Sequence, residues 1–142
     1  MKPLRASVCA QAILAFYFQV TIHGHATAQD VLLMTAFVAP FVVFWFAYSK
    51  GLRWLMWIDT CGYAVWLALE VKTWWVAYPF GTTDSWLRIY QRVFSRSTQL
   101  LPSFGRHIPP DGMHLVLQVL LTSVVVLAVV GLLKTSVRVD ST

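Results

Sequence analysis

Long apolar stretches alternate with short polar connections along the whole chain. The last stretch is the clearest, because Gln118, Thr122 and Ser123 are the only polar residues between positions 115 and 133. A helix needs about 20 apolar residues to cross the hydrocarbon core of a bilayer. Four stretches meet or approach this length: residues 6–22, 31–48, 52–78 and 113–133. We therefore predict an all-α fold, a polytopic transmembrane helical bundle of about four spans that forms one integral membrane domain over residues 1–142.

The segment between the third and fourth stretches has a different pattern. Over residues 85–101 the apolar side chains recur at helical spacing, and Arg88, Arg92 and Arg96 follow one another at every fourth position. This pattern is typical of an amphipathic helix that lies in the membrane interface, with rings toward acyl chains and guanidinium groups toward phosphates. We predict that these three arginines contact lipid headgroups. The alternative is a helix that packs on a partner subunit.

The composition supports a membrane protein and argues against a nucleic-acid partner. Hydrophobic residues make up 58% of the chain and charged residues 12%, against about 25% charged residues in an average soluble domain. The seven tryptophans add apolar surface. The net charge is +5, but the basic residues lie between apolar stretches instead of forming one basic face. We predict an integral membrane protein, in the simplest case of a bacterial inner membrane, with lipids among its partners.

The basic residues also predict an orientation. In a four-span arrangement, three pairs of basic residues would share one side of the membrane: Lys2 and Arg5, Lys50 and Arg53, Lys134 and Arg138. Cytoplasmic flanks carry an excess of Lys and Arg, so we expect both termini to be cytoplasmic. An alternative interpretation treats residues 1–28 as a cleaved signal peptide, because small residues at positions 26–28 follow the first apolar stretch.

Two carboxylates lie inside the third apolar stretch. Asp59, Tyr63, Trp66, Glu70 and Trp74 are spaced by four, three, four and four residues, which places them on one helix face. An ionised carboxylate in lipid costs a few kcal/mol, so this face should point inward. Asp59 and Glu70 are candidate catalytic or proton-handling groups, and Tyr63 and Trp66 are candidates for lining a cofactor pocket; structural ion pairing is the alternative. For Glu70 we expect a buried position beside Trp66, a histidine or an arginine of residues 88–106.

The four histidines form a second candidate site. His23, His25, His107 and His114 would lie on one side of a four-span bundle. Imidazole nitrogens bind zinc and copper, and two histidines from packed helices can ligate haem. The spacing identifies none of these, and a histidine at a helix end can simply hydrogen-bond to carbonyl groups or lipid headgroups.

No sequence motif points to a catalytic class. The chain lacks a Gly-x-Ser-x-Gly motif, a phosphate-binding glycine loop and a dinucleotide-binding fingerprint. With short loops and an apolar, tryptophan-rich surface, the chain offers much of its area to other membrane subunits. We predict a non-catalytic accessory subunit of a larger membrane protein complex. The alternatives are a metal- or haem-binding membrane module, and a small intramembrane enzyme or transporter that uses Asp59 and Glu70.

Overall fold

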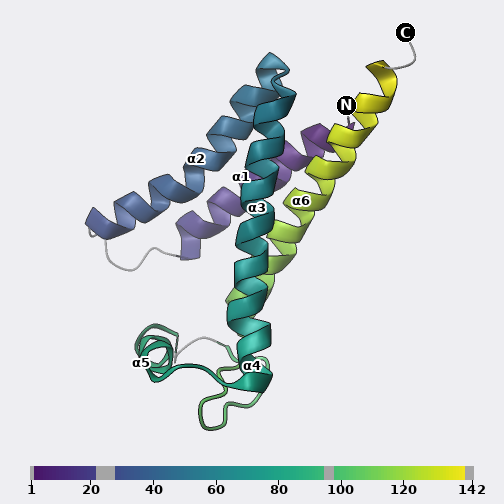
Figure 1. Ribbon diagram of the computed structural model, residues 1–142. Coiled ribbons are helices and arrows are strands. Elements are labelled where there is room, and N and C mark those ends of the chain that lie inside the picture. Colours follow the sequence, from purple (N-terminus) through teal and green to yellow (C-terminus); the bar gives the residue numbers. More distant parts are fainter. Residues whose placement is uncertain (1, 22–27, 95–97, 140–142) are drawn as a thin grey trace. The chain divides into compact units, whose positions relative to one another are not determined.

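The computed structural model describes residues 2–21, 28–94 and 98–139, and their regular structure is helical. Figure 1 shows the elements, which are α1 (Lys2–Thr21), α2 (Ala28–Lys50), α3 (Arg53–Val71), a π-helical segment η1 (Lys72–Val76), α4 (Ala77–Phe80), α5 (Asp84–Val93) and α6 (Gly112–Val139). The chain divides into two compact units. Unit 1 comprises residues 1–64 and 120–142, and unit 2 comprises Val65–Val119, so α3 and α6 each contribute to both.

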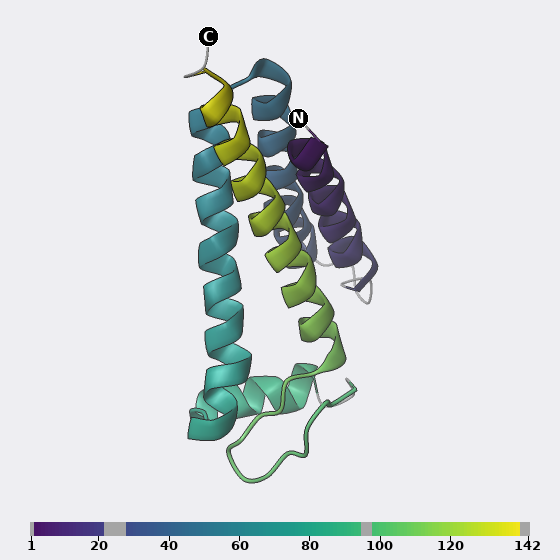
Figure 2. The ribbon, with the colours of Figure 1, turned by 90° about the vertical axis from the view of Figure 1, so that its right-hand side faces the viewer.

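Unit 1 is a bundle of α1, α2, the first half of α3 and the second half of α6. Figure 2 shows the purple helix α1 beside the yellow-green end of α6. The core of this unit combines large and small apolar side chains: Leu4, Phe44, Ala47, Met56, Ala128 and Leu132. The alanines, together with Gly131 of α6, allow the helix backbones to approach closely, as in other tightly packed helix pairs.

The turn between α2 and α3 has the hydrogen bonding of a Schellman motif. Gly51 adopts a φ of 68°, in the left-handed region that a residue without Cβ enters at no steric cost. The backbone N–H of Leu52 donates to the carbonyl oxygen of Ala47 at 2.8 Å, and that of Gly51 donates to Tyr48 at 3.3 Å. These bonds end α2 and let α3 begin at Arg53.

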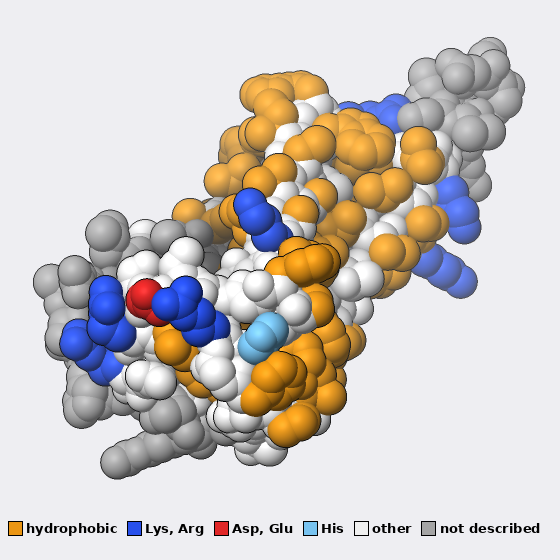
Figure 3. Space-filling model, turned by 60° about the horizontal axis from the view of Figure 1, so that its bottom comes forward, with side chains coloured by type: hydrophobic (Ala, Val, Ile, Leu, Met, Phe, Trp, Pro, Cys, Tyr) orange, Lys and Arg blue, Asp and Glu red, His pale blue; other side chains and the backbone are white. Residues whose placement is uncertain are grey.

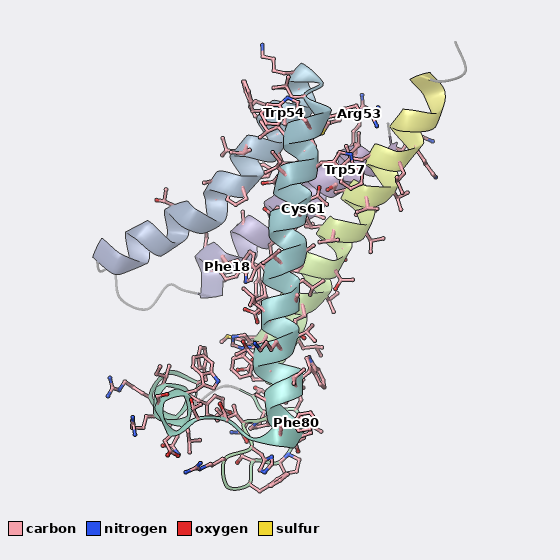
Figure 4. The ribbon with its side chains drawn as sticks, in the orientation of Figure 1. Phe18, Arg53, Trp54, Trp57, Cys61 and Phe80 are labelled. Atoms are coloured by element: carbon pink, nitrogen blue, oxygen red, sulfur yellow. The ribbon has the colours of Figure 1, made fainter. Side chains whose placement is uncertain are left out.

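Two polar contacts tie α6 to its neighbours in unit 1. The Arg53 guanidinium donates to the carbonyl oxygen of Leu132 at 3.0 Å, and Figure 4 shows Arg53 at the start of α3. The Ser7 hydroxyl of α1 donates to the carbonyl oxygen of Val124 at 3.4 Å. Both acceptors are main-chain carbonyls, so these bonds hold the helices without requiring a polar side chain on α6.

Unit 2 combines the end of α3, η1, α4, α5, a long loop and the first turns of α6. Its core contains Trp74, Tyr90 and Ile108, with Trp86, Leu87 and Phe94 packed against them. Thr83 caps α5 by accepting the backbone N–H of Trp86 at 3.3 Å. Pro109 and Pro110 are buried, and the carbonyl oxygen of Pro110 accepts the N–H of Leu100 at 3.0 Å.

The prediction of a four-span transmembrane bundle is wrong, although the all-α class is correct. Among the described residues only one helical segment, Gly112–Lys134 of α6, is long and apolar enough to cross a membrane, with a mean hydropathy of 2.7. Residues 6–21 of the first stretch and most of the ranges 31–48 and 52–78 do fall on helices, but among the described residues none of these helices contains a segment that is both long and apolar enough. Glutamines and Ser7 lower the mean hydropathy of α1, and charged residues and tryptophans lower that of α3. In α2, the apolar run among the described residues is Val38–Lys50, which is too short for a span.

The amphipathic helix is also shorter than expected. We predicted a helix over residues 85–101, whereas α5 ends at Val93. Beyond α5, Gln99 forms an isolated antiparallel β-bridge with Asp111. The backbone N–H of Leu100 donates to the carbonyl oxygen of Pro110. These loop partners satisfy backbone groups that would otherwise continue the helix. Arg88 and Arg92 are exposed, while Arg96 lies outside the described residues.

Candidate functional site

The acidic face predicted on the third stretch is divided between the two units. Asp59 and Tyr63 belong to unit 1, whereas Trp66, Glu70 and Trp74 belong to unit 2. Burial raises the pKa of Asp59 from 3.8 to about 7, and its Oδ2 is buried without a hydrogen-bond partner. Burial, and then the Asp59 charge, raise the pKa of the nearby Tyr63 hydroxyl. At neutral pH the carboxyl group of Asp59 is therefore close to its pKa.

The second carboxylate belongs to a group in unit 2 that we name the Asp–His–Glu cluster, consisting of Asp111, His114 and Glu70. Asp111 precedes α6 and caps it, because its Oδ1 accepts the backbone N–H of His114 at 2.9 Å. The same oxygen lies 2.8 Å from Nδ1 of the His114 ring. The Asp111 side chain is fully buried and that of His114 is 14% exposed, so water does not compete freely for this bond.

The bond to Asp111 determines which ring nitrogen of His114 carries a hydrogen. An ionised carboxylate can only accept, so Nδ1 is the protonated nitrogen in the neutral imidazole. The other nitrogen, Nε2, then has a lone pair and can accept a proton. An Asp–His pair of this kind orients the imidazole and stabilises its protonated form.

Aromatic rings surround His114. The Trp74 ring lies against the imidazole with a centroid distance of 3.8 Å and an angle of 33°, and Phe94 meets it edge-on at 5.1 Å. Trp86, Tyr90 and Phe94 make edge contacts with Trp74 in turn. Trp74 lies in the π-helical segment η1, a local widening of the helix that is frequent at functional sites.

Glu70 lies on α3, outside the candidate membrane span, and the charges of His114 and Asp111 act on its carboxyl. Burial raises the pKa of its carboxyl, whereas the His114 charge and side-chain hydrogen bonds from Trp66 and Trp74 lower it by smaller amounts. One oxygen, Oε2, is buried without a hydrogen-bond partner. Trp66 and a histidine were among the neighbours that the sequence suggested for Glu70, and Trp66 and His114 are both among the groups that lower the pKa of its carboxyl.

The histidines do not come together as a metal site in the described part of the chain. The Tyr78 carbonyl oxygen lies 2.6 Å from Nδ1 of His107, and Phe104 stacks on the His107 ring at 4.6 Å. His23 and His25 lie outside the described residues. Across residues 2–21, 28–94 and 98–139 no group of three or more His, Cys, Asp or Glu side chains could hold a metal.

Sequence reasoning missed the central role of Asp111. An aspartate directly before a long apolar run is a recognised start signal for a helix, and this one precedes Gly112 and the predicted stretch 113–133. That signal predicts the cap. It does not predict that the capping oxygen also contacts the His114 ring, since this depends on the rotamer of a side chain three residues away.

The described basic residues of unit 2 lie on its surface. Figure 3 shows Lys and Arg side chains gathered over α5. Arg106 forms an exposed ion pair with Asp84, in which Nη2 and Oδ1 are 2.9 Å apart. This pair joins the loop to the first turn of α5 and leaves Arg88 and Arg92 exposed on the helix.

No protein-family model matches this chain, and neither a curated protein nor a solved structure is significantly similar to it.

Proposed function

We propose that this protein is anchored in a membrane through α6 and acts as a non-catalytic accessory subunit of a larger membrane protein complex. The observation that carries the proposal is the number of large apolar side chains exposed on the helices of unit 1. Soluble monomers rarely expose apolar patches on this scale. The exposed residues include Ile13, Phe16 and Val20 on α1, Val42, Trp45 and Phe46 on α2, and Trp54 and Ile58 on α3.

The anchoring helix has the features expected of a membrane span. The segment Gly112–Lys134 contains 23 residues, enough for the hydrocarbon core, and Val119 and Val126 are more than half exposed. Lys134 and Arg138 follow its apolar part. Basic residues favour the cytoplasmic side, so we place the end of α6 in the cytoplasm of a bacterial cell and the span in its inner membrane.

The other helices supply the surface for partners. Their exposed apolar side chains pack against helices of a larger membrane protein, since apolar contact and close packing drive such association. Arg88 and Arg92 of α5 are exposed, and we propose that they contact anionic lipid headgroups at the interface.

Membrane anchoring is tested with an arginine in α6. Val126→Arg places a charge near the centre of the candidate span, at an insertion cost of about 3 kcal/mol. The full chain with this change should be lost from carbonate-washed membranes. Ile89→Arg, at an exposed apolar position of α5, is the matched control and should remain membrane-bound. Equal retention of the two variants would show that α6 does not span the bilayer.

The accessory role is tested by the size and composition of the particle extracted in mild detergent. We expect a complex with a fixed ratio of this chain to a larger membrane protein. Phe16→Ser, at a position 69% exposed on α1, should reduce that ratio without changing the unfolding temperature of the purified chain. If the chain is monomeric under every mild extraction, the proposed role is wrong.

A further inference from the structure

The ends of several helices meet at one end of unit 1. α1 begins at Lys2 and α2 ends at Lys50, while α3 begins at Arg53. The apolar part of α6 ends at Lys134. Close to these ends, side chains of all these helices share the core cluster of unit 1, and the Arg53 guanidinium donates to the carbonyl oxygen of Leu132 at 3.0 Å. Figure 2 shows the start of α1 and the end of α6 at the same end of this unit.

Each of these helix ends carries basic side chains, and we name the surface that they form the basic end. It consists of Lys2, Arg5, Lys50, Arg53 and Lys134. Arg53 is partly buried, and the lysines and Arg5 are exposed. Within the part of the chain that the structure describes, no carboxylate forms an ion pair with any of these exposed cations. Asp140 lies outside the described residues. The basic end therefore presents uncompensated positive charge.

Arg5 is oriented on this surface by a neighbouring helix. Its Nε donates to the Tyr48 hydroxyl of α2 at 3.3 Å. A guanidinium has further N–H donors at its terminal nitrogens, and these remain for another acceptor because the Arg5 side chain is exposed. The planar fork that they form matches the oxygens of a phosphate group.

The candidate span of α6 places the basic end at the depth of lipid headgroups, a step that rests on the membrane anchoring proposed above. The span ends at Lys134, and the bond from Arg53 to Leu132 holds the start of α3 at the same level. Trp54, next to Arg53, is 63% exposed. Tryptophan is enriched where a bilayer meets water, because its ring is apolar and its N–H is polar. Figure 4 shows Arg53 and Trp54 at this end of α3.

We propose that the basic end binds the phosphate groups of anionic phospholipids. Headgroup phosphates form a layer, so cations that surround the end of the span contact several of them at once. An anionic lipid attracts these cations more strongly than a zwitterionic lipid, whose phosphate lies beside a positive group. An acidic segment of a partner protein would match the charge, but it gives no reason for an exposed indole beside the cations at the end of a span.

The test compares phosphatidylglycerol with phosphatidylcholine, each titrated into the full chain in a mild nonionic detergent and followed by native mass spectrometry. We expect tighter binding of phosphatidylglycerol. Lys50→Gln combined with Lys134→Gln removes two exposed charges, and each loss should weaken this binding by about fivefold, the usual effect of one basic residue near an anionic surface. Lys72→Gln combined with Arg106→Gln removes two exposed charges from unit 2 instead. This matched control should keep the preference for phosphatidylglycerol.

Several outcomes would overturn the inference. These are a wild type without preference for phosphatidylglycerol, an equal loss of binding in the two double variants, and displacement of the lipid by inorganic phosphate at the same concentration. The wild-type measurement decides even if a variant fails to fold. The result is separable from anchoring, because binding is measured in detergent. A chain that resists carbonate washing but lacks the preference refutes this inference alone, whereas a chain that keeps the preference but is washed off refutes the anchoring alone.

Discussion

Gly131 of α6 packs so closely on Leu4 of α1 that there is no room for a side chain between them. A Cβ atom at Gly131 would lie 2.6 Å from Cγ of Leu4 and 3.0 Å from its backbone nitrogen. The first contact could be relieved by a rotation of the leucine side chain, but the second involves the backbone. The approach of the two helices in unit 1 therefore depends on glycine at this position.

We predict that Gly131→Ala lowers the free energy of unfolding by about 1–3 kcal/mol, the usual cost of overpacking. This loss should exceed the gain of up to about 1 kcal/mol in helix propensity. Gly62→Ala in α3 is the matched control, because a Cβ there meets nothing within 4 Å. Denaturant unfolding in detergent should show the control to be as stable as the wild type or more stable. Equal effects of the two substitutions would contradict the packing argument.

The double contact of Asp111 leads to a second prediction. Asp111→Ala removes the N-cap of α6 and the partner of the His114 ring, and we expect a loss of about 2–4 kcal/mol in the free energy of unfolding. Thr83→Ala removes the exposed cap of α5 and should cost about 1 kcal/mol or less. Asp111→Asn retains an oxygen acceptor and should fall between them. An Asp111→Ala variant no less stable than Thr83→Ala would show that the buried contact is not stabilising.

The raised pKa of Asp59 leads to a prediction of how the stability of the folded protein depends on pH. Folding raises its pKa from 3.8 to about 7, so the folded state favours the protonated acid. Its contribution to stability is complete below about pH 4 and is lost as the pH rises through about 7. Asp59→Asn cannot ionise, so its unfolding temperature should fall less than that of the wild type over this interval. Parallel pH profiles of the two proteins would refute this assignment.

The sequence predicts where the helices of this chain lie better than it predicts whether they cross a membrane. The apolar runs 31–48 and 113–133 lie within α2 and α6, and the run that begins at residue 6 lies within α1 as far as Thr21, since hydropathy over this length specifies a helix. Whether such a helix can cross a membrane depends on the mean hydropathy of the whole helix. In α1 and α3 the polar and charged residues lower this value, so length alone overestimated the number of spans.

Part of the candidate site could also be predicted. The spacing of Trp66, Glu70 and Trp74 predicts one helix face, and side-chain hydrogen bonds from both indoles lower the pKa of the Glu70 carboxyl. The sequence offered a histidine as a neighbour of Glu70 but could not single out His114, because more than 40 residues separate the two. Such contacts depend on the loop that returns the chain to the start of α6. Local periodicity carries no information about that path.

The π-helical segment Lys72–Val76 makes the position of Trp74 sensitive to the number of residues in this turn. A π turn contains more residues than an α turn, so a helix can lose one residue here and still continue as an ordinary α-helix. Each residue of an α-helix accounts for about 100° of rotation. A chain shorter by one residue in this turn would keep its helix, yet it would rotate the Trp74 indole away from the His114 ring. The extra residue therefore works as a spacer that sets the rotational phase of the helix where the aromatic cluster begins.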